Sequence, residues 1–409
     1  MQKNSGFTAF EMTLAKPFIS MASEPYESQF TAYKVGDEMD PYSPNQKHLL
    51  QSIFNWLLIS LFCLTSCTAA ADPGEIRGTA SSPTEGAPNI IIINADDLGW
   101  GDLGCYGGQA IKTPHVDSLA DQGIRMTSFY SCDAVCTPSR AGLITGRYPI
   151  RMNLHYPLFP ENLSPIEQFY QDIKIIGALV GNFDSPLEHG ASGINPQEVT
   201  IAEALKEEGY RTGMVGKWHL GDYSQSPQYN PLNHGFDVYF GVPHSNDMRP
   251  FPLYRNYEEL ESHIEDQAKL TRLYTEEAVA FIESSLSSPF FLYLAHTFPH
   301  RPLHASEPFR NQSEGGLYGD AVEEIDWSLG QILDTLTIHN LYDNTLIIFT
   351  SDNGPWYEGN AGSFRGGKGQ SYEGGFRIPF IARWPGRITP GSVSHEAAMN
   401  IDLFPTCLG

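Results

Sequence analysis

Asn89-Ile-Ile-Ile-Ile-Asn94 is an unbroken β-branched run, and Ala95-Asp-Asp-Leu-Gly99 follows it directly. A continuous apolar run of this kind is typical of a strand that is buried on both faces of a parallel sheet. The two acidic residues after it then lie at the carboxyl end of a strand, where open α/β sheets bind their ligands. This stretch therefore predicts both the class of the fold and the place of its site.

Strands and helices alternate along the rest of the chain. Further strands are expected at 125–130, 210–215, 290–295, 346–350 and 378–382. Helical periodicity lies between them, at 114–122, 139–143, 199–208, 270–285 and 322–336, with Gly123 and Gly209 as C-terminal stops. The alternation predicts an α/β fold with a doubly wound, mainly parallel central sheet flanked by helices. The stretches 152–195 and 222–265 are long and irregular, and we expect them to be insertions that line a site.

An apolar run at 54–67 precedes this domain. It is shorter than the roughly 20 residues that a membrane span needs, and it is typical of a secretion signal. Leu64-Thr-Ser-Cys67 also resembles the lipobox at which bacterial lipoproteins are cleaved and lipidated on Cys. A buried core helix is the alternative, and a start at Met39 would give a signal of ordinary length. We expect an exported protein made of an N-terminal extension with the signal (1–70), a linker (71–88) and a folded domain (89–409).

The composition limits the class of partner. The 409 residues carry a formal net charge of −23, and 41% of them are hydrophobic, enough for a sizeable core in one large domain or two smaller ones. The negative field of the protein disfavours nucleic acid as a partner, because it repels phosphate. An anionic substrate therefore needs a local cluster of Lys, Arg, His or metal that inverts this field in one pocket.

The six cysteines do not suggest a disulfide framework. Cys63 and Cys67 lie in the predicted signal, which leaves Cys105, Cys132, Cys136 and Cys407 for the rest of the chain. No Cys-x-x-Cys pair occurs, so a structural zinc site has little support.

Two strand ends carry oxygen ligands for a metal. Asp96 and Asp97 follow the first strand, and Ser351-Asp352-Asn353-Gly354 follows the strand at 346–350. Adjacent carboxylates need a cation, and a set of oxygen donors suits Ca²⁺ or Mg²⁺ rather than zinc. Each segment taken alone is also compatible with a plain turn or a helix cap.

A third element is Cys136-Thr-Pro-Ser-Arg140-Ala-Gly-Leu-Ile-Thr-Gly146. Pro138 fits the opening turn of a helix, Cys136 is expected just before it, and a helix start favours anions. As a bare pattern, a lone Cys in this place is more often a small buried apolar residue.

Cys136-Thr-Pro-Ser-Arg140 followed by Thr145-Gly-Arg147 resembles the signature of the sulfatase family, which belongs to the alkaline-phosphatase-like superfamily. Gly216-Lys-Trp-His-Leu-Gly221, Pro299-His-Arg-Pro302 and Gly366-Gly-Lys-Gly369 resemble three further blocks of that family. The stretch Phe240-Gly-Val-Pro-His-Ser-Asn-Asp-Met248 is most similar to arylsulfatase A-type members. The resemblance runs from about 89 to 409.

The resemblance implies an arylsulfatase-type hydrolase in which Cys136 is converted to formylglycine by a maturation enzyme. The hydrated aldehyde would offer one hydroxyl to attack sulfur and a second to expel sulfate, which an unmodified Ser could not do. The family's functional positions fall here on a metal set and on residues that contact the formylglycine or the sulfate. The metal set is Asp96, Asp97, Cys136, Asp352 and Asn353, and the other catalytic residues are Arg140, Lys217, His219, His300 and Lys368.

Roles follow by the same resemblance. Lys217 and Lys368 would grip sulfate oxygens, His219 would orient the hydrate, and His300 would protonate or position the ester oxygen. Arg140 would hold the formylglycine and metal region. Ser245 and His296 are further candidates for substrate binding.

Other functions stay open on the sequence alone. A phosphate or phosphonate ester hydrolase could use the same scaffold, and sulfate and phosphate monoesters differ in charge. Family members continue beyond Asn400-Ile-Asp-Leu-Phe-Pro405 into a small C-terminal antiparallel subdomain, which we expect to be missing here. An inactive, truncated protein that only binds sulfated glycans is therefore a second alternative, and the sequence does not identify the natural substrate.

Overall fold

We describe a computed structural model of the chain, which covers residues 86–161 and 191–409. The predicted signal at 54–67 and most of the expected insertion at 152–195 lie outside the described residues. Among the helices of the described part, none combines the length and the apolarity that a membrane crossing requires.

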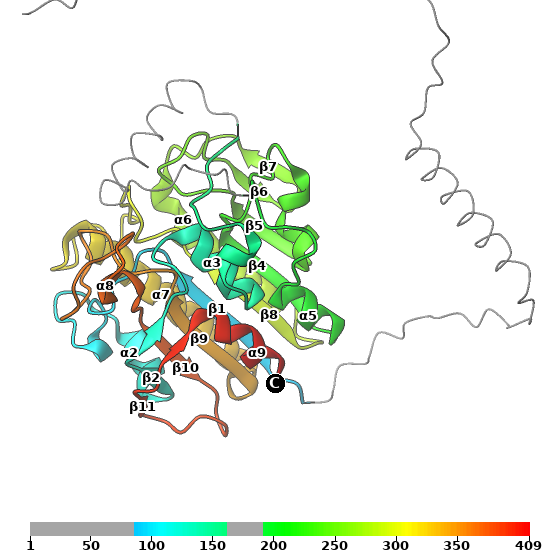
Figure 1. The fold of residues 1–409 in the computed structure, drawn as a ribbon. Coiled ribbons are helices and arrows are strands. Elements are labelled where there is room, and N and C mark those ends of the chain that lie inside the picture. The colour runs from blue at the N-terminus through cyan, green and yellow to red at the C-terminus, as the bar shows by residue number, and fades with distance from the viewer. Residues whose placement is uncertain (1–85, 162–190) are drawn as a thin grey trace, which may run out of the picture. The chain divides into compact units, whose positions relative to one another are not determined.

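Strand β1 (Asn89–Ala95) is the centre of the fold (Figure 1). It pairs in parallel with β8 (Phe290–Ala295) on one side and with β9 (Thr345–Ser351) on the other, and all three strands are buried throughout. This burial confirms the prediction drawn from the isoleucine run, since both faces of β1 are covered by side chains from helices.

Ten strands form the main sheet, in the order β11-β2-β10-β9-β1-β8-β4-β5-β6-β7. The strands other than the central three are β2 (Ile124–Met126), β4 (Arg211–Lys217), β5 (Val238–Val242), β6 (Leu253–Arg255), β7 (Glu258–Glu261), β10 (Phe380–Arg383) and β11 (Ser392–Ser394). The five central strands β9, β1, β8, β4 and β5 run parallel, whereas β10, β6 and β7 pair with their neighbours in antiparallel fashion. The doubly wound, mainly parallel α/β class is confirmed. A two-stranded sheet, β3 (Phe129–Tyr130) with β12 (Ala398–Met399), accompanies it.

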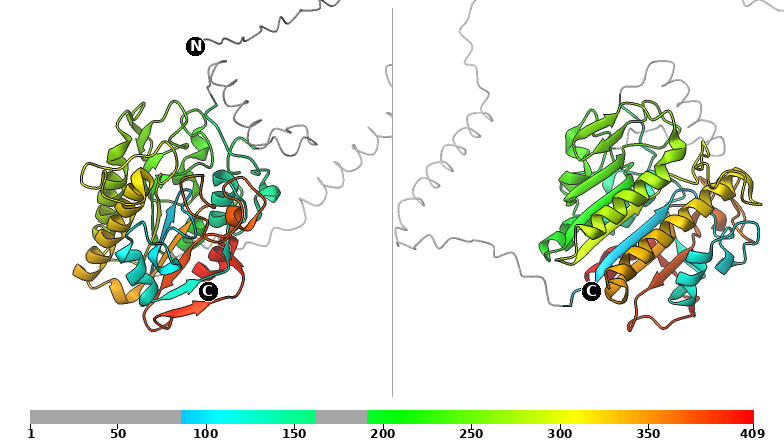
Figure 2. Two further views of the ribbon diagram at one scale, coloured as in Figure 1. Left: turned by 90° about the vertical axis from the view of Figure 1, so that its left-hand side faces the viewer. Right: turned by 180° about the vertical axis from the view of Figure 1, so that it is seen from behind.

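Helices cover both faces of this sheet. One hydrophobic cluster lies under α2 (Pro114–Asp121), α6 (Leu270–Glu283) and α7 (Gly316–Ile338), which Figure 2 shows from behind. The other lies under α3 (Cys136–Thr145), α5 (Ile201–Glu207) and α9 (Leu403–Leu408), on the side that faces the viewer in Figure 1. Alternate residues of β1 point to the two clusters, Ile91 and Ile93 to the first and Ile90 and Ile92 to the second.

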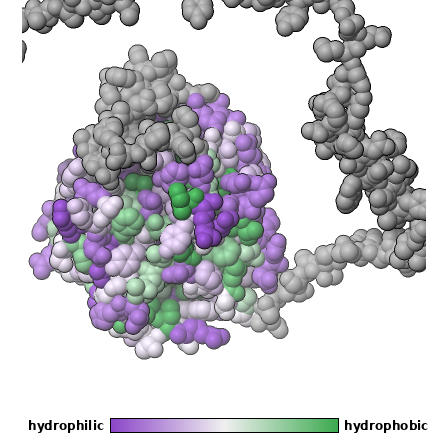
Figure 3. Space-filling view, viewed as in Figure 1, coloured by the Kyte–Doolittle hydropathy of each residue, from purple (hydrophilic) through white to green (hydrophobic). Residues whose placement is uncertain are grey.

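Short elements complete the chain. They are η1 (Gly104–Tyr106), η2 (Pro149–Met152), η3 (Pro227–Tyr229), η4 (Pro231–His234), η5 (Gln267–Lys269), η6 (Tyr342–Asn344), η7 (Asn400–Asp402) and α8 (Glu373–Phe376). On the face shown in Figure 3, hydrophilic and hydrophobic residues are interspersed.

Several predicted elements need correction. The expected strand at 125–130 is two short strands, β2 and β3, which belong to different sheets. The stretch 222–265 is not wholly irregular, because β5, β6 and β7 extend the main sheet there. Helix α7 begins at Gly316, six residues before the predicted start, and α3 begins at Cys136 itself. Gly209 follows the end of α5 with a φ of 86°, as a C-terminal stop requires.

Candidate active site

The carboxyl ends of β1 and β9 bring together four oxygen-bearing side chains, those of Asp96, Asp97, Asp352 and Asn353. All four are buried, although three of them carry a formal charge. The backbone N–H of Asp97 donates to Asp352 Oδ1 at 3.1 Å, and Asn353 Nδ2 donates to Asp97 Oδ1 at 2.7 Å. Asp97 takes a φ of 68°, a left-handed conformation that is costly for a residue with a side chain and that clusters at functional sites. The two strand ends predicted from the sequence therefore meet.

Helix α3 begins at this group. Cys136, its first residue, places Sγ 3.4 Å from Asp96 Oδ1 and 3.2 Å from Lys368 Nζ. The thiol is buried, at 3% exposure. Burial raises the pKa of the Cys136 thiol above its usual range, and the Asp96 carboxylate adds to the effect, so the thiol is protonated near neutral pH.

Three cationic side chains balance the three carboxylates. Arg140 donates to Asp352 Oδ2 and to the carbonyl of Lys217, both at 2.9 Å, and its Nη2 lies 3.4 Å from Asp96. Lys217 forms an ion pair with Asp96 and donates to Ser245 Oγ at 2.6 Å. Lys368 Nζ lies 2.7 Å from Asp97 Oδ1. These cations make the local cluster that an anionic substrate needs in a protein of charge −23.

The charges perturb one another strongly. Burial alone would raise the pKa of Asp96, but the basic side chains around it, Lys217 first and then His300, Arg140 and Lys368, hold it well below its usual range. Burial, helped by the Asp96 carboxylate, raises the pKa of Asp352 to about 6. Burial would lower the pKa of Lys368, yet Asp97 and the other acidic groups raise it well above its usual range. A pair of carboxyls with divergent pKa values marks a place where a further cation would bind favourably.

Hydrogen bonds orient His219 and His300. His219 Nε2 lies 2.9 Å from the carbonyl of Leu158, an acceptor, so that nitrogen carries the proton. Nδ1 of His219 is buried and has no hydrogen-bond partner among the described residues. Burial, with the charge of Lys217, keeps the pKa of His219 well below its usual value, so the ring is neutral. The ring therefore offers a free lone pair.

His300 carries its proton on the other ring nitrogen, Nδ1. Its Nδ1 lies 2.9 Å from Asn246 Oδ1 and 2.5 Å from the carbonyl of Arg301, both acceptors. The amide of Asn246 cannot be reversed, because its Nδ2 donates to Gln267 Oε1 and to the carbonyl of Pro302. Nδ1 of His300 is then the protonated nitrogen, and Nε2 faces Asp97 Oδ2 at 3.8 Å. Burial lowers the pKa of His300.

The residues suggested by sequence are brought together with one exception. Ser245 joins the group through Lys217, as described above. His296 is fully buried, and its ring centroid lies 6.4 Å from that of Tyr274 in α6. Neither ring nitrogen of His296 has a partner among the described residues, and burial lowers its pKa to about 3. No contact joins it to the charged cluster in the described chain, so its assignment to substrate binding has no geometric support.

The donor set fits a hard divalent cation. Atoms of Asp96, Asp97, Cys136 and His300 lie within 4.8 Å of one another. Asn353 Oδ1 is buried without a partner among the described residues, although its Nδ2 is satisfied. An unpaired buried amide oxygen beside carboxylates is an unfavourable arrangement that an oxygen-seeking cation would relieve.

Some supporting residues were not identified from the sequence. Asn246, which fixes His300, and Thr137, whose hydroxyl donates to the carbonyl of His219 at 3.0 Å, act across long stretches of chain. Asp222 and His244, whose carboxylate and ring lie 3.6 Å apart, form a buried pair next to Ser245. For Asn246 and His244, the one available signal was their position beside Ser245 in the stretch 240–248. Thr137 likewise lies beside Cys136, whereas for Asp222 the sequence offered no such signal.

Comparisons with known proteins agree with this geometry. The chain matches the Sulfatase family over residues 88–409. It is 40% identical to N-acetylgalactosamine-6-sulfatase of Homo sapiens over 353 residues, which cover 81% of this chain and 63% of that protein. It is 38% identical to an arylsulfatase of Hemicentrotus pulcherrimus, over 78% of this chain and 57% of that protein. The chain thus spans about three fifths of the length of these curated relatives. Among solved structures, PsFucS1 sulfatase from Pseudoalteromonas sp. superposes with a TM-score of 0.66 at 31% identity, covering 79% of this chain and 67% of that one.

Proposed function

The chain belongs to the sulfatase family, and from that premise we propose that it hydrolyses sulfate esters, with residue 136 as the nucleophile after conversion of Cys136 to formylglycine. The observation that carries the proposal is the position of Cys136. It is the first residue of α3, and its side chain touches both Asp96 and Lys368 in a buried cluster of balanced charge. A covalent nucleophile needs this combination of oxyanion stabilisation and nearby proton acceptors.

The cation proposed for the site is Ca²⁺, with Mg²⁺ as the second candidate, and Asp96, Asp97, Asp352 and Asn353 would hold it. When bound, such a cation neutralises negative charge on the reacting oxygens and lowers the pKa of a hydroxyl beside it. The hydrate of formylglycine supplies two hydroxyl groups on one carbon, the first to attack sulfur and the second to release sulfate by re-forming the aldehyde.

The remaining steps belong to the side chains of this protein. Lys217, Lys368 and Ser245 bind oxygens of the sulfate group, whose charge is dispersed over them. His219, neutral and with Nδ1 free, accepts the proton of a hydroxyl on residue 136. Arg140 has a positioning role, because both of its bonds are to the protein and tie Asp352 to the backbone of β4.

His300 acts on the leaving group. With Nδ1 committed to Asn246 and Arg301, only Nε2 can face a bound ester. The sulfate ester brings one negative charge, which raises the proton affinity of a ring beside it, and protonated Nε2 then donates to the departing alkoxide oxygen.

The substrate class proposed is a sulfated sugar. The relatives include N-acetylgalactosamine-6-sulfatases, and the half-buried Trp356 and Phe364 line a cavity together with Lys368. A formylglycine-generating enzyme is the partner that activity requires. We also propose that the protein is exported, on the strength of the apolar segment at 54–67, and a lipid anchor at Cys67 would be its link to a membrane.

A panel of matched esters tests the proposal. The full chain is coexpressed with a formylglycine-generating enzyme and assayed with 4-nitrophenyl sulfate, phosphate and methylphosphonate. We expect turnover of the sulfate ester, and none by Cys136→Ala protein. A preference for the phosphate ester, which carries up to two negative charges, or for the phosphonate ester, which carries one as the sulfate ester does, would replace the proposed activity with the alternative one.

A further inference from the structure

The loop between β9 and α8 forms a cavity directly beside the charged cluster. The cavity measures about 370 Å³, within the range of roughly 300–1,000 Å³ in which small ligands bind. Pro355, Trp356, Tyr357, Asn360 and Phe364 line it together with Lys368, which also contacts Asp97 and Cys136. A ligand in the cavity therefore shares Lys368 with a sulfate group at residue 136.

Hydrogen bonds hold the walls of the cavity in place. The N–H of Lys368 donates to the carbonyl of Pro355 at 2.9 Å, which closes the loop upon itself. Asn360 N–H donates to Asp102 at 3.0 Å, and Gly101 N–H donates to the carbonyl of Asn360 at 2.7 Å. The shape of the cavity is thus fixed before a ligand arrives, which reduces the entropy lost on binding.

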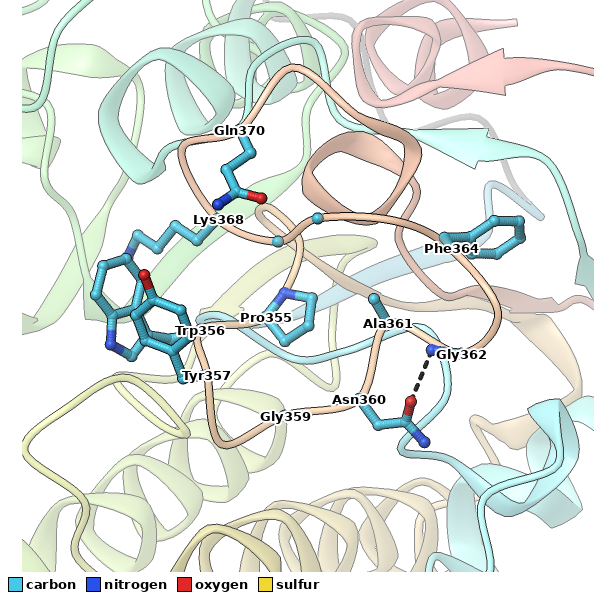
Figure 4. A pocket seen from close by; sticks show the side chains of 12 residues that line it. Pro355, Trp356, Tyr357, Gly359, Asn360, Ala361, Gly362, Phe364, Lys368 and Gln370 are labelled. Carbon is cyan, nitrogen blue, oxygen red and sulfur yellow. Dashed lines mark hydrogen bonds between the residues drawn. The ribbon is translucent and has the colours of Figure 1, made fainter. Parts of the chain in front are cut away.

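Two aromatic rings lie at the end of the cavity that is nearest to Lys368. Figure 4 shows the Lys368 side chain extending toward the same end as Trp356 and Tyr357, while Phe364 lies at the opposite end. The two rings form an edge-to-face pair with centroids 4.7 Å apart. Tyr357 is 81% exposed, the highest value among the exposed large hydrophobic and aromatic side chains of the described chain. Trp356 is half-buried. An accessible aromatic pair at a site is suited to stacking on a ligand.

The same end of the loop lies on the leaving-group side. Glu358 forms an ion pair with Arg301 at 3.0 Å, and Arg301 directly follows His300, which faces the ester oxygen in the proposed reaction. In a bound ester, the group attached to that oxygen would extend from the charged cluster between His300 and Lys368 and contact the rings of Trp356 and Tyr357.

We propose that Trp356 and Tyr357 form the binding site for the sugar ring that carries the sulfate, and that they determine specificity for saccharide esters. The proposal rests on the proposed function, because it uses Lys368 and His300 as the sulfate end of the substrate. A pyranose ring suits the cavity, since it has an apolar face for the aromatic rings and a rim of hydroxyls for Asn360 and Gln370, which line the cavity. The carboxylate of Glu358 is already paired, so a sulfated sugar meets no unpaired negative charge from that residue.

The first test measures binding without turnover. Cys136→Ala protein, as the full chain, is titrated with N-acetylgalactosamine-6-sulfate by calorimetry. Adding Trp356→Ala should raise the dissociation constant about tenfold, as expected for the loss of one aromatic contact. Trp356→Phe in its place should restore most of the lost affinity. Tyr357→Ala removes an exposed ring that contributes little to folding, and should weaken binding about threefold or more. Tyr257→Ala removes another exposed ring, in the turn between β6 and β7, and should leave binding unchanged.

A second test separates this proposal from the activity itself. With matured protein, Trp356→Ala should raise the KM for the sulfated sugar about tenfold and leave the KM for propyl sulfate, which cannot reach the rings, within twofold. If the matured protein hydrolysed neither ester, the proposed function would be contradicted. The binding measurement would still test whether the rings of Trp356 and Tyr357 bind the sugar. Equal dissociation constants for the parent and both ring variants, or no binding of the sugar to Cys136→Ala protein, would overturn the assignment of the sugar site.

Discussion

The guanidinium of Arg140 is buried and donates hydrogen bonds to two parts of the sheet. One goes to Asp352, just after β9, and the other to the carbonyl of Lys217, at the end of β4. Removal of Arg140 leaves the buried Asp352 without its nearest cation, and leaves Lys217 as the nearest cation of Asp96. We predict that Arg140→Met lowers the free energy of unfolding by about 3–5 kcal/mol, the usual effect of breaking one side of a buried ion pair. Denaturant unfolding in EDTA measures it, with exposed Arg151→Met as the control. A loss below about 1 kcal/mol would show that the pair is not needed for stability.

Asp102 gives the protein a pH dependence of its own. Burial raises the pKa of Asp102 from 3.8 to about 6, although Tyr318, Asn360 and Gly99 donate hydrogen bonds to it. Between those two values the folded state binds more protons than the unfolded state, so the stability contributed by this group falls as pH rises through the window.

The prediction follows from that sign. The stability of the parent protein relative to Asp102→Asn should fall by about 2–3 kcal/mol between pH 4 and pH 7.5, since two pKa units correspond to that amount. Unfolding by denaturant at both pH values measures the difference. A difference that is constant with pH would mean that Asp102 is ionised in the folded protein at low pH.

At the scale of single residues, local motifs made most members of the charged cluster predictable. Asp96, Cys136, Lys217 and Lys368 each stand in a short stretch of sequence whose chemistry can be recognised. The orientation of His300 could not be predicted, because it depends on Asn246, 54 residues away in the chain. The candidate role of His296 stays a prediction from the sequence, because its ring is fully buried near Tyr274 of α6 and contacts no member of the charged cluster among the described residues.

Strand β4 depends on a glycine where it pairs with β8. Gly216 takes a φ of 109°, and a Cβ on it would lie 1.8 Å from the carbonyl oxygen of Ala295. We predict that Gly216→Ala lowers the free energy of unfolding by more than about 3 kcal/mol, because backbone strain and overpacking both act.

Gly107→Ala is the matched control for this prediction. Gly107 has a similar φ of 97° but open space around its Cβ position, so only backbone strain of about 1–2 kcal/mol applies. Thermal or denaturant unfolding compares the two variants. If both variants lost the same free energy of unfolding, the positive φ alone, and not the close approach of β4 to β8, would explain why position 216 needs glycine.

The central strands were predictable and the edges were not. β1, β8 and β9 are continuous apolar runs whose bounds differ from the prediction by at most one residue. β6 and β7 are short, and the sequence of β7, Glu258-Glu-Leu-Glu261, has no strand pattern of its own. It is a strand because it pairs with β6, which in turn pairs with β5. Pairing energy from a neighbouring strand replaces intrinsic preference at the edge of a sheet.

The charged cluster connects parts of the molecule that are far apart in sequence, namely the ends of β1 and β9 and the start of α3. A bound cation should therefore stabilise the whole fold, since ligands that bind only the folded state add RT ln(1 + [L]/Kd). We predict that Ca²⁺ at 100 times its Kd raises the free energy of unfolding by about 2.7 kcal/mol, and that EDTA removes this gain.

The specificity of that effect has a simple control. Asp352→Asn should lose most of the Ca²⁺-dependent rise in Tm, whereas Asp343→Asn, at an exposed carboxylate, should keep it. A rise in Tm that is equal in both variants would locate the cation elsewhere.

The central claim is that Cys136, placed at the start of α3 among these charges, becomes the nucleophile for sulfate ester hydrolysis. The most direct measurement is peptide mass spectrometry across residue 136, combined with sulfate release, on samples coexpressed with increasing amounts of a formylglycine-generating enzyme. The account predicts a mass loss of about 18 Da at residue 136, with turnover proportional to the converted fraction and absent without it. Turnover that does not change with the converted fraction, or that persists at full rate in Cys136→Ala protein, would contradict it.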